Sequence, residues 1–155
     1  MNQKSSADSQ VDQKSSGPAQ LIRVIGYILG FSYPILALSA GTRGLYQIFF
    51  RDDIPNKLGP ALSVVAALVY VTAAFGFLTQ RKWAWKMSVA SLAFELIGIV
   101  IVGSLSFAFT DALTHTAWSR FGIDYGFFPL FQPVLGLVWL FWPETLRTYR
   151  IGERR

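Results

Sequence analysis

Long apolar stretches separated by short polar segments dominate the chain. Residues 24–42, 58–80 and 125–143 contain no charged side chain, and residues 87–110 contain only Glu95. Crossing the hydrocarbon core of a bilayer takes about 20 helical residues, so each stretch is long enough to span it. Backbone groups in lipid must satisfy their own hydrogen bonds, and the stretches lack the alternation of a membrane β-barrel. The pattern therefore predicts an all-α protein, a membrane-embedded four-helix bundle.

Both ends of the chain are polar and lie outside these stretches. In residues 1–20 the sequence Gln-Lys-Ser-Ser occurs twice, ten residues apart. Polar, low-complexity sequence cannot bury apolar surface, so we expect a disordered N-terminal tail there. Residues 21–150 then form the transmembrane domain, and residues 151–155 form a basic C-terminal tail.

The composition agrees with a membrane protein and excludes several kinds of site. The 155-residue chain is 52% hydrophobic and 15% charged, against roughly 25% charged residues in soluble domains. It has no cysteine and one histidine, which excludes disulfides, thiolate ligands and a multi-histidine metal centre. It also lacks a nucleotide-binding loop and a nucleophile motif such as Gly-x-Ser-x-Gly. We therefore expect no metal, no cofactor and no catalytic residue, and hence a protein that is not an enzyme.

Lysine and arginine are divided unevenly between the two predicted sides of the membrane. Ten lie in the N-terminal tail and helix entry, the 81–86 loop and the segment after residue 146, and four lie in the other two loops. The more basic side usually faces the cytoplasm, so we expect a multi-pass plasma-membrane protein with both termini in the cytoplasm. These charges are explained by topology and by contact with anionic lipid, so nucleic-acid binding is not expected.

Aromatic side chains gather in the two segments predicted to be outer loops, about 43–57 and 111–124. Such side chains either lie in the membrane interface or dock a second membrane protein. In the second loop Arg120 and Asp124 have the i, i+4 spacing of an ion pair. The candidate partner or interface surface consists of Tyr46, Phe49, Phe50 and Trp118.

Glu95 is the single charged residue within the four predicted spans. An acidic group at the centre of a membrane helix costs about 2.5–3.5 kcal/mol, so such groups usually face the bundle interior. At about 1.5 Å per residue, Glu95 lies about 12 Å inside its span, near the midplane. The same count puts four other polar side chains at similar depth, and Gln132 one or two turns nearer the outside. The candidate polar or ligand cluster consists of Glu95, Ser32, Tyr33, Tyr70, Thr72 and Gln132.

Three interpretations of Glu95 stay open. It is a protonated, hydrogen-bonded link between helices, or it binds a proton, a cation or a polar ligand, or it contacts a partner subunit. On the same span, small residues line a stripe that favours close helix packing, within the bundle or between two copies. The stripe is Ser91, Glu95, Gly98 and Val102.

Two functions are consistent with these features. The first is an accessory or interaction subunit, whose partners are the lipid bilayer and a membrane protein or a second copy of the chain. The alternative is a small carrier or binder of a lipid, a proton or a small molecule that uses the polar cluster around Glu95.

Five motifs in the second half of the chain stand out: residues 83–86, 94–98, 102–106, 116–126 and 129–136. Together they resemble a family of small actinobacterial integral membrane proteins of unassigned function. The resemblance covers about residues 83–140. It implies a four-helix plasma-membrane protein, and it implies no substrate, cofactor or catalytic residue.

Overall fold

Helices make up most of the computed structural model, which describes residues 3–152. The helices are α1 (Gln3–Phe50), α2 (Leu58–Leu78), α3 (Lys82–Leu105), α4 (Thr110–Leu113), α5 (Phe128–Leu140) and α6 (Pro143–Thr148). Two 3₁₀ turns, η1 (Ser119–Phe121) and η2 (Ile123–Tyr125), lie between α4 and α5. Residues 3–152 contain no strand, so the predicted all-α class is confirmed.

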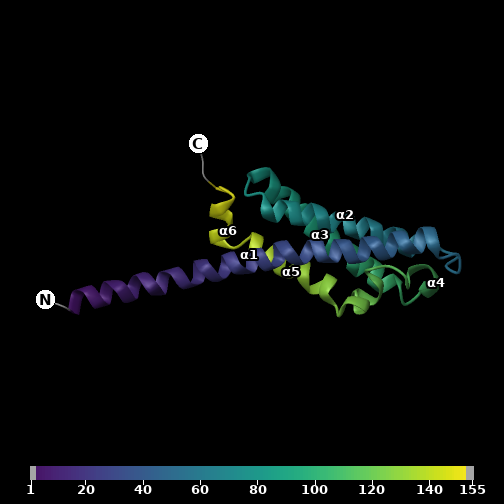
Figure 1. Ribbon diagram of the computed structural model, residues 1–155, viewed down its shortest axis with the longest axis horizontal. Coiled ribbons are helices and arrows are strands. Elements are labelled where there is room, and N and C mark those ends of the chain that lie inside the picture. Colours follow the sequence, from purple (N-terminus) through teal and green to yellow (C-terminus); the bar gives the residue numbers. More distant parts are fainter. Residues whose placement is uncertain (1–2, 153–155) are drawn as a thin grey trace.

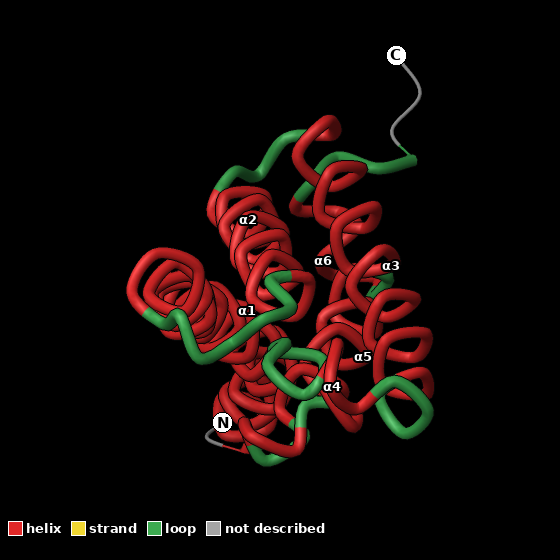
Figure 2. The backbone as a smooth tube through the Cα atoms, turned by 90° about the vertical axis from the view of Figure 1, so that its right-hand side faces the viewer, coloured by secondary structure: helices red, strands yellow, loops and turns green. Residues whose placement is uncertain are grey.

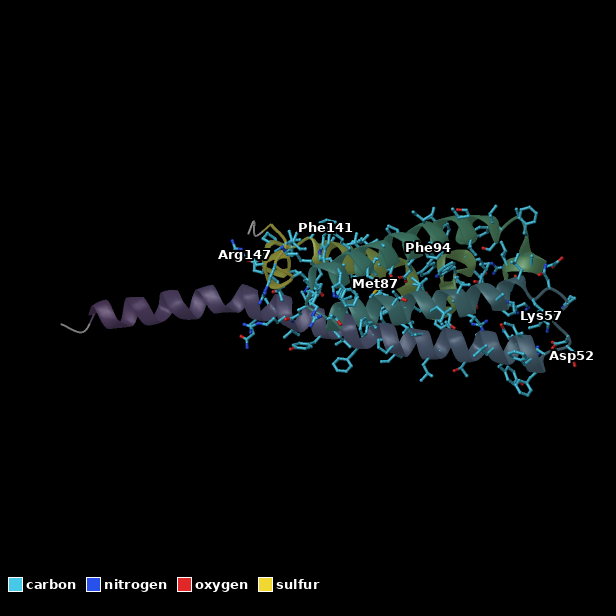
Figure 3. All side chains as sticks on the ribbon, turned by 90° about the horizontal axis from the view of Figure 1, so that it is seen from above. Asp52, Lys57, Met87, Phe94, Phe141 and Arg147 are labelled. Carbon is cyan, nitrogen blue, oxygen red and sulfur yellow. The ribbon has the colours of Figure 1, made fainter. Side chains whose placement is uncertain are left out.

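The long helices pack in chain order, α1 against α2, α2 against α3 and α3 against α5, and α5 makes a smaller contact with α1 (Figure 1). Figure 2 looks roughly along the bundle and shows α1 at one side of it, beside α2. Figure 3 places Asp52 and Lys57 at one end and Arg147 at the other. We call these the loop end, which carries the α1–α2 loop, and the basic end, which carries α6 and the α2–α3 turn.

Three helices are long enough and apolar enough to cross a membrane: Gln20–Phe50 of α1, α2 and α3. With 21 and 24 residues, α2 and α3 are about 32 and 36 Å long at about 1.5 Å per residue. The hydrocarbon core is about 30 Å thick, so these helices are those of a multi-pass membrane protein. The number of spans rises to four only if α5 is joined to the segment before it.

The fourth predicted span, residues 125–143, is broken in the structure. Gly126 and Phe127 have positive φ, and α5 contains only 13 residues, about 20 Å of helix. The axis of α5 makes an angle of 97° with that of Ser119–Tyr125. Left-handed backbone at Gly126 separates the two, and Pro143, which cannot continue a helix, begins α6.

α1 is longer than predicted in both directions. Toward the loop end it continues to Phe50, so the connection to α2 contains residues 51–57 rather than 43–57. Toward the N-terminus it continues back to Gln3 and leads away from the other helices (Figure 1), where we predicted a disordered tail. A helix without tertiary packing is marginal in water, so disorder of the polar segment stays a prediction.

Candidate functional site

The interior of the bundle contains buried polar side chains from four helices. Tyr33 of α1, Tyr70 of α2, Glu95 of α3 and Gln132 of α5 are between 0 and 2% exposed. Glu95 is inward-facing because the buried positions of α3 repeat every three or four residues, which keeps them on one face of the helix. We call these four residues the midplane cluster.

Close packing between α3 and α5 puts two members of the cluster at one level. A Cβ atom built on Gly136 would lie 2.9 Å from Cδ1 of Leu92, so these residues touch. Because α3 and α5 run in opposite directions, Glu95 and Gln132 both lie about one turn from this contact toward the loop end, at about 4.5 and 6 Å along their helices. Gln132 therefore does not lie one or two turns nearer the outside, as predicted. From this contact α3 continues for thirteen residues to Leu105, whereas α5 begins only eight residues away at Phe128, so α5 starts deeper in the bundle than the end of α3.

The two tyrosines complete the cluster from α1 and α2. Their ring centroids are 5.9 Å apart, and Tyr33 also stacks on Phe77 at 5.6 Å. The Tyr33 hydroxyl faces the Glu95 carboxyl closely enough for an electrostatic interaction but does not reach hydrogen-bonding geometry. The Tyr70 hydroxyl accepts a hydrogen bond of 3.2 Å from Nε1 of Trp118.

Four oxygen atoms of the midplane cluster are buried without a hydrogen-bond partner among the described residues. They are Oη of Tyr33, both carboxyl oxygens of Glu95 and Oε1 of Gln132. A buried polar group left unpaired costs about 1–3 kcal/mol. The side chains that carry these four atoms are between 0 and 2% exposed, so the cluster is closed to its surroundings and its oxygens lack partners among the described residues.

Two predicted members of the cluster differ from the rest. Thr72 does not join it, because its Oγ1 donates 2.8 Å to the carbonyl of Leu68 on its own helix. Two residues along a helix correspond to a rotation of about 200°, which takes Thr72 off the face of Tyr70. Ser32 is only partly buried and accepts 2.7 Å from Nε2 of Gln132.

Trp118, predicted to lie on an exposed outer loop, is only 2% exposed. Its ring lies against Gly98 of α3, where an added Cβ would be 2.8 Å from Cζ3 of the ring. Gly98 is seven residues inside Leu105, the last residue of α3, so the ring reaches about 10 Å into the bundle. The small-residue stripe of α3 therefore accommodates an aromatic ring from the α3–α5 connection, which the sequence interpretation missed.

The α3–α5 connection is also anchored to α1 and α2. Oγ of Ser63 accepts 2.9 Å from the backbone N–H of Ala117. Asp124 pairs with Arg43 of α1 at 3.1 Å, and not with Arg120 as the spacing predicts. Arg120 has a φ of 46°, so the backbone is not a regular helix and the i, i+4 relation does not hold there.

The other aromatic side chains predicted to form an interface are exposed at the loop end of α1. Tyr46, Phe49 and Phe50 are 53%, 71% and 73% exposed, and the rings of Tyr46 and Phe50 stack at 5.7 Å. Phe49 follows Tyr33 by sixteen residues, about 24 Å of helix. With Tyr33 at the midplane of a bilayer, Phe49 would lie outside the hydrocarbon core of about 30 Å, near the outer edge of the headgroup region.

Comparisons with known proteins find no family model, no curated protein and no solved structure that matches this chain. In the part of the chain that the structure describes, no group of three or more His, Asp or Glu side chains is placed to hold a metal ion. The resemblance to actinobacterial membrane proteins stays a prediction, and the midplane cluster is the candidate site that the geometry offers.

Proposed function

We propose that this chain is a non-enzymatic integral membrane protein that binds a proton or a small monovalent cation at the midplane cluster. The observation that carries this proposal is the set of four unpartnered buried oxygens on Tyr33, Glu95 and Gln132. A protonated Glu95 has a hydrogen to donate to Gln132 or Tyr33, whereas an ionised Glu95 needs a cation. Carboxylate, amide and hydroxyl oxygens are suitable ligands for a hard cation.

The packing argues for a small occupant. If Glu95 were only a structural link, well-formed hydrogen bonds from its carboxyl to other helices would be expected, whereas the neighbouring Tyr33 hydroxyl of α1 faces it without reaching hydrogen-bonding geometry. A lipid or an organic molecule needs a cavity, whereas Glu95 is 0% exposed among packed side chains of the bundle. Intramembrane acidic residues commonly mark ion or proton pathways.

The test compares Glu95→Gln with Asp111→Asn, which makes the same carboxyl-to-amide change at an exposed position. Thermal unfolding of the purified protein is measured over a range of pH and in sodium, potassium, lithium or choline chloride at constant ionic strength. Below about pH 10, where Tyr149 does not titrate, the wild type and Asp111→Asn should have midpoints that depend on pH or cation, and Glu95→Gln should lose this dependence.

A wild-type midpoint that responds in this pH range to neither pH nor cation refutes the proposal, as does a dependence there that is as large in Glu95→Gln as in the wild type. If Glu95→Gln does not fold, Tyr33→Phe provides the same comparison, because it removes only the hydroxyl. Under this proposal Tyr33→Phe weakens the response by removing one of the oxygen ligands.

A second function, that of an interaction subunit, is supported by the exposure of α1. In its most apolar stretch 28% of residues are buried, against 44% in α2 and 39% in α3, and the exposed aromatic side chains Tyr46, Phe49 and Phe50 continue this surface. The double change of Phe49 and Phe50 to Ser should release a co-purifying membrane protein without lowering the unfolding midpoint. Phe107→Ser, at a side chain that is 65% exposed elsewhere, is the control. An unchanged set of co-purifying proteins contradicts this function.

We further propose that the protein lies in the plasma membrane with both termini in the cytoplasm, on the strength of the excess of Lys and Arg at the basic end. The absence of native cysteine allows single cysteines to be introduced without background. An impermeant thiol reagent should label Asn56→Cys in whole cells and should not label Lys82→Cys. The opposite labelling overturns the orientation.

A further inference from the structure

A cavity at the basic end of the bundle is separate from the midplane cluster. Its volume is about 600 Å³, and it lies between α1, the end of α2, α5 and α6. Phe77, Leu78 and Trp139 form apolar parts of its wall, whereas Arg23, Glu144 and Thr145 form polar parts. The wall is therefore amphipathic.

Hydrogen bonds hold the walls of this cavity in place. Nε1 of Trp139 donates 2.7 Å to the carbonyl of Ile22, and the ring lies against Gly26, where a Cβ atom would collide with it. The Tyr149 hydroxyl donates 3.1 Å to the carbonyl of Gly76, which fixes the end of α6 against the last turn of α2. The cavity is thus bounded by ordered side chains.

Polar groups in the wall lack partners among the described residues. Thr145 is 2% exposed, and its Oγ1 makes no hydrogen bond. Oε2 of Glu144 is also buried without a partner. Arg23 lines the same cavity but forms no ion pair with Glu144, since the ion pairs of the described chain are Arg43–Asp124 and Arg51–Asp53. Opposite charges that share one cavity without pairing are complementary to a ligand that carries both signs.

The cavity lies at the depth of lipid headgroups. Arg23 precedes Tyr33 by ten residues, about 15 Å of helix, which is half of a hydrocarbon core of about 30 Å. Tyr27 and Leu78, which also line the cavity, are 62% and 64% exposed. The cavity is therefore open to the lipid that surrounds the helices.

We propose that this cavity binds a phospholipid whose headgroup is a zwitterion of a phosphate and a primary ammonium. Arg23 binds the phosphate in a charge-assisted pair, the Glu144 carboxylate accepts hydrogen bonds from the ammonium, and the Thr145 hydroxyl donates to a phosphate oxygen. The acyl chains leave past Tyr27 and Leu78.

Glu144 favours a zwitterionic headgroup over a purely anionic one. The neighbouring cavity, of about 560 Å³, is lined by Arg81, Lys82 and Arg150 and by no acidic residue. That cavity has the composition that binds anionic headgroups. An anionic lipid is therefore the necessary comparison in the test.

The test measures binding of short-chain lipids to the purified protein by native mass spectrometry and by the shift of the unfolding midpoint. Phosphatidylethanolamine, phosphatidylglycerol and phosphatidylcholine with identical chains are compared with free phosphoethanolamine. We expect phosphatidylethanolamine to bind about tenfold more tightly than the other three.

Three variants test the residues that contact the headgroup. Arg23→Gln, Glu144→Gln and Thr145→Val should each weaken the binding of phosphatidylethanolamine about tenfold, the effect of losing one charge-assisted hydrogen bond. Arg147→Gln should bind as the wild type does, because Arg147 is exposed on α6 and lines neither cavity.

Several results would overturn the proposal. A preference for phosphatidylglycerol means an anionic site, and equal binding of the three lipids means an unselective lipid contact. Free phosphoethanolamine binding as tightly as the lipid means a soluble ligand. A loss in Arg147→Gln equal to that in Arg23→Gln means that general charge is responsible. If Thr145→Val lowers the unfolding midpoint measured without lipid, its weaker binding no longer isolates the lost hydroxyl. Binding of phosphatidylethanolamine to Arg23→Gln then tests the proposal, because Arg23 is exposed and its replacement leaves the core intact.

Discussion

The contact between Trp118 and Gly98 predicts that a single methyl group destabilises this protein. In most helices Gly→Ala is stabilising by about 1 kcal/mol, because alanine has the higher helix propensity. At Gly98 the new Cβ would lie 2.8 and 2.9 Å from two atoms of the Trp118 ring. The ring is 2% exposed and hydrogen-bonded to Tyr70, so it has little room to move. Overpacking of this kind costs about 1–3 kcal/mol, and the net effect is a loss of about 0–2 kcal/mol.

Gly30→Ala is the matched control. Gly30 is likewise a glycine inside a spanning helix, buried where Gly98 is half-buried, but its added Cβ would lie 3.7 Å from the nearest atom, in Leu78, which is an ordinary contact. Gly30→Ala should therefore gain stability, and the two variants should differ by about 1–3 kcal/mol. Equilibrium unfolding in mixed detergent micelles, followed by tryptophan fluorescence, measures the difference. If Gly98→Ala is as stable as Gly30→Ala, the ring of Trp118 does not lie on α3, and the folding of the α3–α5 connection into the bundle is refuted.

Two further changes test contacts at the basic end and at the loop end. Tyr149→Phe removes the hydroxyl that donates to the carbonyls of Gly76 and Phe77 in the last turn of α2 and should cost about 1 kcal/mol of unfolding free energy. Because burial raises the pKa of Tyr149 from 10.0 to about 12, the folded protein keeps this proton longer than the unfolded chain. Stability should therefore fall as the pH rises from about 10 to about 12, and a fall of the same size in Tyr149→Phe contradicts this. Asp124→Asn breaks the pair with Arg43, whose side chains are 36% and 39% exposed, so the loss should be below about 1 kcal/mol and should vanish in high salt. A larger loss that salt does not reduce contradicts a solvent-screened pair.

Parts of the midplane cluster could be predicted because they depend on local geometry. The depth of Glu95 follows from the rise per residue of a helix, and its inward orientation follows from the cost of a carboxyl group in lipid. The same count along two other spans predicts Tyr33 and Tyr70 at that depth, and all three side chains are buried together. Thr72 shows the limit of this reasoning, because depth alone does not determine which face of a helix a residue occupies.

The uncharged runs by themselves determined that this chain is an all-helical membrane protein and that Glu95 is its one charge in the middle of a span, since both follow from the energetics of single residues in lipid. Only the tertiary structure decided how the loop end is filled. There a short α5 and the ring of Trp118 take the place of a full fourth span. That arrangement depends on contacts between residues far apart in the chain, such as Gly98 with Trp118 and Ser63 with Ala117. Hydrophobic patterns report how apolar a segment is, and they do not report which distant surface has the shape to receive it.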